Sequence, residues 1–204
     1  MFPLRSALSV VFALSPAVLS GQESTAPDST PFRSGQWAAQ FGVSSGYASL
    51  GVLKFTAPTR AWLLDARVSG GHEDRELRNT NPDTTVTQFE SDASVTLRLG
   101  RRFYGSGRDH VVGLYSIGAS GGIAHSAGGQ RGGSAGETNG WNVGVFFELG
   151  ASYLVNRRLS LGAIGSASLS YSRSVSKGST GFRSEISRYG GSLSAVSLVA
   201  TVYF

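Results

Sequence analysis

Residues near position 125 combine the types that ester hydrolysis needs. His125, Ser126 and Glu137 could act as the base, the nucleophile and the acid that orients the base. His125 and Ser126 are adjacent, however, so on a β-strand their side chains point to opposite faces. We interpret this region as a polar strand end that enters a glycine-rich loop, and we keep an ester hydrolase as an alternative.

Two G-x-S-x-G patterns, at residues 118–122 and 132–136, match the turn that presents a hydrolase serine. That turn joins a strand to a helix and needs an acid and a histidine further along the chain. Ser134 is followed by no histidine, and Ser120 is followed only by His125. Residues 128–134 also imitate a phosphate-binding loop but lack its lysine. None of these patterns predicts an active site.

Histidine and cysteine give no indication of a metal site or a cofactor. His72, His110 and His125 lie in different parts of the chain, and the sequence contains no cysteine. Metal-binding motifs place their ligands at short, defined spacings. We therefore expect no metal and no cofactor. Because none of the serine patterns above predicts an active site, we also expect that the protein is not an enzyme.

Polar and apolar residues alternate with a period of two from position 36 onward. This period is typical of a strand with two different faces. In the clearest segment, Trp141, Val143 and Val145 alternate with Asn142 and Gly144. The alternating segments are 37–44, 47–55, 62–68, 89–103, 111–123, 141–153, 159–172 and 196–204. They predict an all-β protein of eight antiparallel strands.

The polar face of these segments distinguishes two kinds of barrel. A soluble barrel turns its apolar face inward, whereas a transmembrane barrel turns it outward. The polar face here consists mainly of glycine, serine and other small residues, which suit the narrow lumen of an eight-stranded barrel. Charged residues make up 15% of the chain, below the roughly 25% of soluble domains. The sequence favours an eight-stranded, up-and-down transmembrane β-barrel.

Aromatic residues lie at both ends of the apolar rows, where the surfaces of a membrane would be. The row from Trp141 to Tyr153 spans roughly 30 Å at about 3.3 Å per residue and a tilt near 40°. One rim would contain Trp37, Phe55, Trp62, Phe103 and Tyr153, and the other Tyr47, Phe89, Trp141 and Tyr171. Short turns near 58–59, 105–109 and 156–157 alternate with longer polar loops at 72–86, 125–139 and 174–187, as in outer-membrane barrels.

The last strand ends in an alternating apolar row, Val196, Leu198, Ala200, Val202 and Phe204. With the alternation over residues 36–204, this row resembles the small OmpA/OmpX-type outer-membrane barrels. The resemblance implies a monomer in the outer membrane of a Gram-negative cell, surrounded by lipid and lipopolysaccharide. It also implies that the barrel-assembly machinery recognises Phe204 as a signal. The family more often has a second aromatic residue two positions before the terminal one, whereas here Tyr203 directly precedes Phe204.

The family has no single activity, so two alternatives to a non-enzymatic barrel stay open. Outer-membrane lipid A deacylases resemble the region of His125, but they place the serine two residues after the histidine, and here that position is Ala127. The second alternative is a narrow channel. Basic residues flank the last predicted loop, where lipopolysaccharide phosphates would lie: Arg173, Lys177, Arg183 and Arg188. An ordinary solvated loop explains them equally well.

Eight charged residues fall on the face expected to line the lumen: Lys54, Asp65, Arg67, Glu90, Asp92, Arg98, Arg102 and Glu148. This assignment points Lys54 inward and Leu53 and Phe55 outward. Isolated charges in so narrow a lumen would be costly, so we expect the four positive and four negative groups to pair across it. We expect Glu148 in the middle layers with Arg98 or Arg67 as its partner, which makes a channel less favoured.

The first 35 residues differ in composition from the rest. Residues 1–21 are typical of a signal peptide, with Arg5, an apolar run over 7–19 and small residues at 20–21. Residues 22–35 predict a flexible periplasmic lead-in before the barrel at 36–204. The net charge is +5, but the basic residues are dispersed, so we expect no nucleic-acid partner. The loops contain no recognisable ligand-binding motif, so the external ligand cannot be identified from the sequence.

Overall fold

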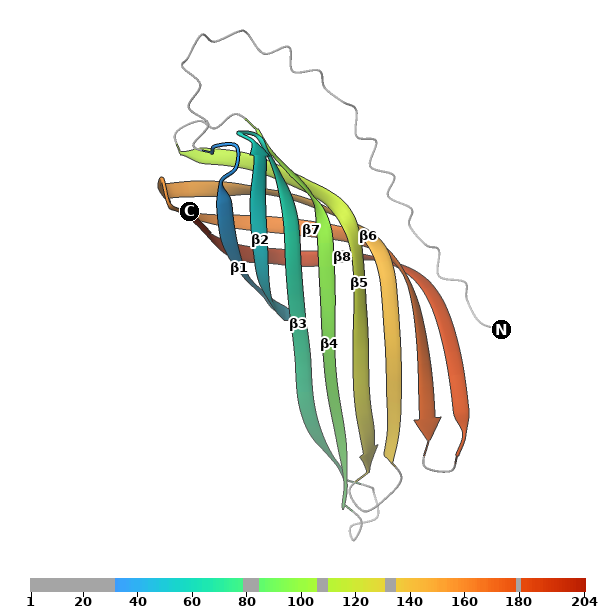
Figure 1. Cartoon of the computed structure of the whole chain (residues 1–204). Coiled ribbons are helices and arrows are strands. Elements are labelled where there is room, and N and C mark those ends of the chain that lie inside the picture. The colour runs from blue at the N-terminus through green and yellow to red at the C-terminus, as the bar shows by residue number, and fades with distance from the viewer. Residues whose placement is uncertain (1–31, 79–84, 106–109, 131–134, 179–180) are drawn as a thin grey trace, which may run out of the picture.

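The residues that the structure describes form eight antiparallel strands, which close into a barrel in sequence order (Figure 1). The computed structural model describes residues 32–78, 85–105, 110–130, 135–178 and 181–204. The strands are β1 (Trp37–Ser44), β2 (Tyr47–Ala57), β3 (Arg60–Arg78), β4 (Thr85–Tyr104), β5 (Val111–Gln130), β6 (Ala135–Asn156), β7 (Leu159–Gly178) and β8 (Arg183–Tyr203). The described residues contain no helix long and apolar enough to cross a membrane. The predicted signal peptide lies outside the described ranges.

The pairing of β1 with β8 closes the barrel. The paired residues run from Ala38 with Tyr203 to Val43 with Leu198. Followed the other way, through β2 to β7, the ladder of paired residues from Val43 reaches β8 at Ser187. This offset between Ser187 and Leu198 is the stagger that tilts the strands of a closed barrel.

Side chains alternate between the outer surface and the lumen along each strand. Leu97 and Leu99 of β4 and Ile117 of β5 are more than half exposed on the outside, whereas Arg98, between the two leucines, and Ser116, next to Ile117, are buried. Alternation follows from the pleat, which points successive side chains to opposite faces. The predicted outward apolar face is present in every described strand except β2.

On β2 the prediction is wrong. Leu53 and Phe55 are buried in the lumen, and Tyr47 faces inward with them. Lys54 is exposed on the outside, with its ammonium 5.1 Å from the centre of the Trp37 ring. Apolar residues occupy both faces of β2, so its alternation does not define which face is inside. Tyr47 and Phe55 therefore do not belong to the predicted outer girdles, and Lys54 is not a lumen charge.

The three predicted long loops are mostly strand. Paired strands continue through them, so that His72 lies opposite Ser91 and His125 opposite Asn139. The connections between strands shrink to residues 79–84, 131–134 and 179–182. Polar residues occupy both faces of these extensions, and a strand without a buried face shows no apolar alternation. The sequence pattern therefore ends before the strands do.

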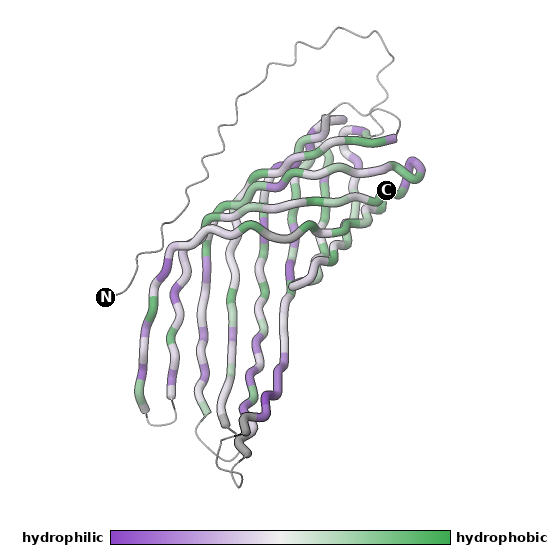
Figure 2. Tube along the Cα trace, turned by 180° about the vertical axis from the view of Figure 1, so that it is seen from behind, coloured by the Kyte–Doolittle hydropathy of each residue, from purple (hydrophilic) through white to green (hydrophobic). Residues whose placement is uncertain are grey.

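The barrel is closed along only part of its length, because β1 and β2 are much shorter than the other strands. Beyond the hairpin that joins them, β3 to β8 continue as a curved six-stranded sheet (Figure 1). Residues 69–78 of β3 and 183–197 of β8 each pair on one side only among the described strands. Hydrophobic residues are frequent in the closed part, and hydrophilic ones become more frequent toward the free ends of the long hairpins (Figure 2).

Candidate functional site

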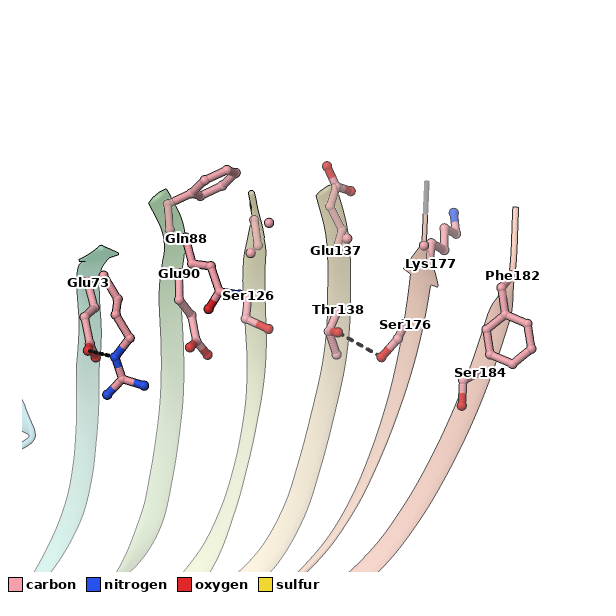
Figure 3. Close-up of a pocket in the computed structure, with 17 residues that line it drawn as sticks. Glu73, Gln88, Glu90, Ser126, Glu137, Thr138, Ser176, Lys177, Phe182 and Ser184 are labelled. Carbon is pink, nitrogen blue, oxygen red and sulfur yellow. Dashed lines mark hydrogen bonds and ion pairs between the residues drawn. The ribbon is translucent and has the colours of Figure 1, made fainter. Parts of the chain in front are cut away.

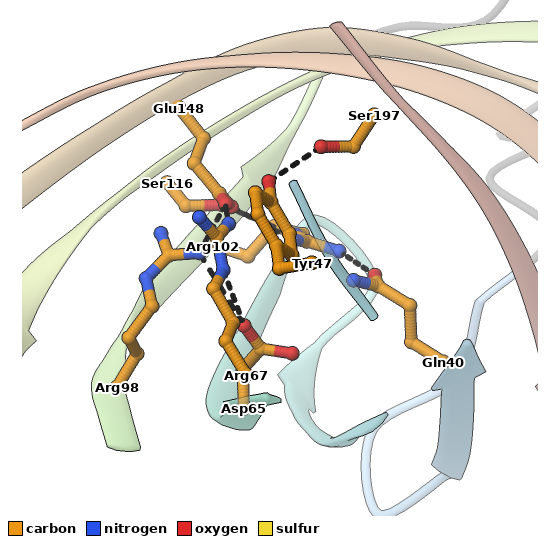
Figure 4. A network of polar contacts seen from close by, with 9 residues as sticks. All are labelled: Gln40, Tyr47, Asp65, Arg67, Arg98, Arg102, Ser116, Glu148 and Ser197. Carbon is orange, nitrogen blue, oxygen red and sulfur yellow. Dashed lines mark hydrogen bonds and ion pairs between the residues drawn. The ribbon is translucent and has the colours of Figure 1, made fainter. Parts of the chain in front are cut away.

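Glu148 is the centre of an ion-pair network inside the closed part of the barrel (Figure 4). Its Oε1 lies 2.7 Å from Nη1 of Arg98 and 3.0 Å from Nη2 of Arg67. Its Oε2 lies 3.0 Å from Nη2 of Arg102. Glu148 comes from β6, Arg67 from β3 and the other two arginines from β4. Glu148 is only 2% exposed. Three guanidinium groups therefore share one carboxylate that is buried.

Asp65 is the second carboxylate of the network. Its Oδ2 accepts hydrogen bonds from Nε of Arg67 at 3.2 Å and from Nη1 of Arg98 at 3.3 Å. Its Oδ1 is buried and has no hydrogen-bond partner among the described residues, and neither has Nη2 of Arg98. Buried charges are stable only when they are paired and hydrogen-bonded. The network meets this requirement except at these two atoms.

Arg102 is buried completely and uses all its guanidinium nitrogens. Nη2 pairs with Glu148, Nη1 donates to the side-chain oxygen of Gln40, and Nε donates to Oγ of Ser116 at 2.9 Å. The partners come from β6, β1 and β5. Arg102 thus links strands on different sides of the lumen, so its side chain spans the interior.

Phe146 supports Arg98 from the neighbouring side of the lumen. The Cζ atom of Arg98 lies 3.7 Å from the centre of the Phe146 ring, a cation–π arrangement. Glycines at 100 and 118 make room for this ring, since a Cβ on Gly100 or Gly118 would come within 2.9 or 2.7 Å of its atoms. The alternation on β6 was predicted, but this inward aromatic residue was not. The two facing glycines are the signal that could have indicated it.

An aromatic cluster fills the lumen near the short turns, next to the network. The ring of Phe32 lies 4.8 Å from that of Phe55, 4.6 Å from that of Tyr104 and 5.2 Å from that of Tyr203, measured between centres. All four residues are buried, and the hydroxyl of Tyr203 is 2.9 Å from Oγ of Ser160. Phe32 belongs to the segment 22–35 that was predicted to be a flexible lead-in. Residues 22–31 of that segment lie outside the described ranges, but the ring of Phe32 is packed into the barrel, so the prediction of flexibility does not hold at this residue.

The structure therefore brings together five of the eight predicted lumen charges and leaves three apart. Asp65, Arg67, Arg98, Arg102 and Glu148 form the network. Lys54 is outside, as described above. Glu90 and Asp92 are exposed in the six-stranded part, and neither has an ion pair among the described residues. Water solvates them there because the wall is open, so they have no need to pair.

Glu90 lines a broad concavity of about 950 Å³ across the ends of the six long strands (Figure 3). Its lining mixes acidic, basic and hydroxyl side chains: Glu73, Arg75, Glu137, Lys177, Thr138 and Ser176. Thr138 and Ser176 form a hydrogen bond with 2.8 Å between their oxygens. The concavity has no dominant charge that would select a ligand.

The residues considered for an ester hydrolase do not form a catalytic arrangement. Nδ1 of His125 lies 2.8 Å from Oδ1 of Asn139, and among the described residues the exposed imidazole forms no hydrogen bond with Ser126, which lines the concavity. The G-x-S-x-G pattern at 118–122 lies inside strand β5, away from any strand-to-helix turn, and most of the pattern at 132–136 lies outside the described residues. Among the residues described, no group of His, Asp and Glu side chains could hold a metal ion.

Comparison with known proteins identifies the fold. No protein-family model matches the sequence, and no curated protein matches it. The chain is similar in structure to a major outer membrane protein of Thermus thermophilus, with 15% identity, a TM-score of 0.54 and coverage of 83% of this chain and 98% of that one. This likeness confirms the predicted fold class.

CarO2 and CarO of Acinetobacter baumannii are more distant. Their identities are 10% and 12%, and their TM-scores are 0.44 and 0.37. Each comparison covers 83% of this chain, with 98% of CarO2 and 96% of CarO.

Proposed function

We propose that this protein is a non-enzymatic barrel of the cell outer membrane, with a closed lumen and outer hairpins that contact lipopolysaccharide or an external partner. The observation that carries the proposal is a ring of strands whose large apolar side chains mostly face outward, while five charged side chains form an ion-pair network inside it. Water-soluble proteins bury their large apolar side chains, and a contiguous apolar surface of this kind needs lipid or a partner around it.

The outward surface of the closed part has the composition of a membrane belt. Trp37, Trp62, Trp141 and Tyr153 are exposed near its edges, with leucine, valine and isoleucine between them. Backbone N–H and C=O groups in a bilayer must find partners within the protein, and a closed ring of strands provides them. Lys54 beside Trp37 fits the edge of such a belt, because its ammonium can reach the polar interface.

The closed lumen argues against a diffusion channel. Two adjacent layers of buried side chains occupy it, the aromatic cluster around Phe32 and the network around Glu148. An eight-stranded barrel has an interior just wide enough for side chains to fill. Opening a path would require moving buried ion pairs apart, which is costly in a water-poor interior.

The outer hairpins offer the surface for a partner. Tyr189 and Leu193 of β8 are each 88% exposed. Lys177 lies directly opposite Arg183 in the ladder of β7 and β8, so two cations are adjacent. Guanidinium and ammonium groups on the same hairpin as aromatic and apolar side chains suit a phosphorylated glycolipid such as lipopolysaccharide. Arg173 is less available, because it already pairs with Glu185.

Cell fractionation and gel mobility test the proposal. We expect the protein in the outer-membrane fraction, exported by means of the predicted signal peptide, and we expect it to migrate faster before boiling than after. The faster band arises because a folded barrel is more compact than the unfolded chain. Recovery as a soluble periplasmic protein without a mobility shift would contradict the proposal.

A further inference from the structure

A second cavity, of about 400 Å³, lies between the ion-pair network and the open part of the barrel. Its walls are mostly hydroxyl and amide side chains: Ser69, Ser94, Thr96, Ser120, Asn142, Ser168, Ser170, Ser172 and Ser192. The charged residues that line it, among those described, are Arg67 and Arg98, and its lining contains no Asp or Glu. A volume of this size is enough for a small ligand.

The charge beneath this cavity is unbalanced. The network contains three guanidinium groups, on Arg67, Arg98 and Arg102, and two carboxylates, on Asp65 and Glu148. Even with both carboxylates ionised, one positive charge is left without a partner among the described residues. A buried charge without a counter-charge is unfavourable. An anion in the cavity would compensate it.

Two arginines are placed to meet such an anion. Arg98 is 3% exposed, and its Nη2 has no hydrogen-bond partner among the described residues. The side chain of Arg67 is 17% exposed and uses Nε and Nη2 for the two carboxylates, which leaves Nη1 for a further acceptor. The ring of Tyr47 holds the Arg67 guanidinium in place, with its centre 4.4 Å from Cζ. Arg67 is thus the direct contact, and Arg98 adds positive charge behind it.

The position of the cavity gives it two entrances. It lies at the tip of the β1–β2 hairpin, where Gly46 and Tyr47 line it together with Ser69 of β3 and Ser192 of β8. At this level β3 and β8 are not joined by a strand of the described chain. An anion can therefore reach the arginines from the open end of the barrel or from the side, between β3 and β8.

We propose that this cavity binds an oxyanion of the phosphate class at Arg67 and Arg98, either as a free ion or as the headgroup of a lipid that enters between β3 and β8. The hydroxyl walls would donate hydrogen bonds to its remaining oxygens. Guanidinium groups bind phosphate well because they offer several N–H donors in one plane. The proposal depends on the geometry of the lumen and not on the outer partner proposed above.

Titration calorimetry of the refolded full barrel tests this proposal, in a non-ionic detergent and a low-salt, phosphate-free buffer. One titration uses inorganic phosphate, and a second uses short-chain phosphatidylglycerol below its micelle concentration. Ser120→Glu adds a carboxylate directly opposite Arg98, since Ser120 is its ladder partner on β5, and Ser120→Gln is the neutral control of the same size. Asn142→Asp adds a charge to the same cavity with almost no change of shape. Gel mobility shows whether each variant is folded.

Saturable binding of inorganic phosphate by the wild type supports the site with a free anion as its ligand. Saturable binding of the lipid alone supports the site with a headgroup entering from the side. In either case we expect Ser120→Glu and Asn142→Asp to weaken binding by about tenfold or more, because the new carboxylate compensates the excess positive charge of the arginines and repels the anion. We expect Ser120→Gln to bind as the wild type does. No saturable binding of either probe, or equal binding by the wild type and both acidic variants, would overturn the proposal.

Discussion

Glu148 and Arg98 meet at 2.7 Å inside the barrel although they come from β6 and β4, which are separated by β5. The pair therefore reaches across an intervening strand. Both side chains are buried, so water screens neither charge. Arg67 and Arg102 depend on the same carboxylate, so Glu148 is the residue whose loss affects the most partners.

Glu148→Ala should destabilise the protein strongly, by about 3–5 kcal/mol of unfolding free energy, because it leaves buried arginines without their counter-charge. Urea unfolding in detergent micelles, followed by tryptophan fluorescence, measures the change. The matched control is Glu185→Ala, which removes the exposed partner of Arg173 and should cost less than about 1 kcal/mol. Equal effects of the two substitutions would contradict a structural role for the buried network.

Phe32→Ala should destabilise the barrel by about 3 kcal/mol, since it empties the centre of the aromatic cluster. The same unfolding measurement applies. Phe182→Ala is the control, because Phe182 is largely exposed near the end of a long hairpin and should change stability by less than about 0.5 kcal/mol. If Phe32→Ala is as mild as the control, the lead-in does not contribute to closing the lumen.

The number of strands and the face of most of them could be predicted from the sequence, because their outward residues are apolar and their inward residues small or charged. On strand β2 the predicted face was wrong, because both faces are apolar: Leu53 and Phe55 pack inside, and Leu50 and Val52 lie outside. The extensions of β3 to β8 were missed for a different reason. They have polar residues on both faces, so their sequence shows no alternation of apolar and polar residues. Backbone pairing between neighbouring strands does not require such an alternation.

The candidate site could be predicted in part. The alternation alone placed Asp65, Arg67, Arg98 and Glu148 on the inner face, and the cost of isolated charges predicted that they would pair. Arg98 or Arg67 was predicted as the partner of Glu148, and both pair with it. Its third partner, Arg102, was not predicted, because the stagger of the strands decides which residues of β4 reach the level of Glu148 and cannot be read from one strand at a time. Phe32 was missed because it lies in a polar segment whose composition predicts no packing.

Phe204→Asp should lower the amount of protein inserted in the outer membrane and leave more in the periplasm for proteolysis. The proposed reason is that the barrel-assembly machinery recognises the aromatic residue beside the closing strand pair. The backbone N–H of Phe204 donates to the carbonyl of Trp37 at 2.9 Å, so the residue adjoins β1. Quantitative blotting of cell fractions measures insertion, with Phe182→Asp as the control. Unchanged insertion of Phe204→Asp would exclude it as the assembly signal.

Planar-bilayer recording of the purified wild-type protein is the most direct test of a closed lumen. Because the aromatic cluster and the Glu148 network fill successive layers of the interior, we predict no steady conductance from the wild type at moderate voltage. The Glu148→Ala protein, if it inserts, should show brief openings as the released arginines move. A stable ohmic conductance in the wild type would contradict the closed lumen and make a narrow channel the correct function.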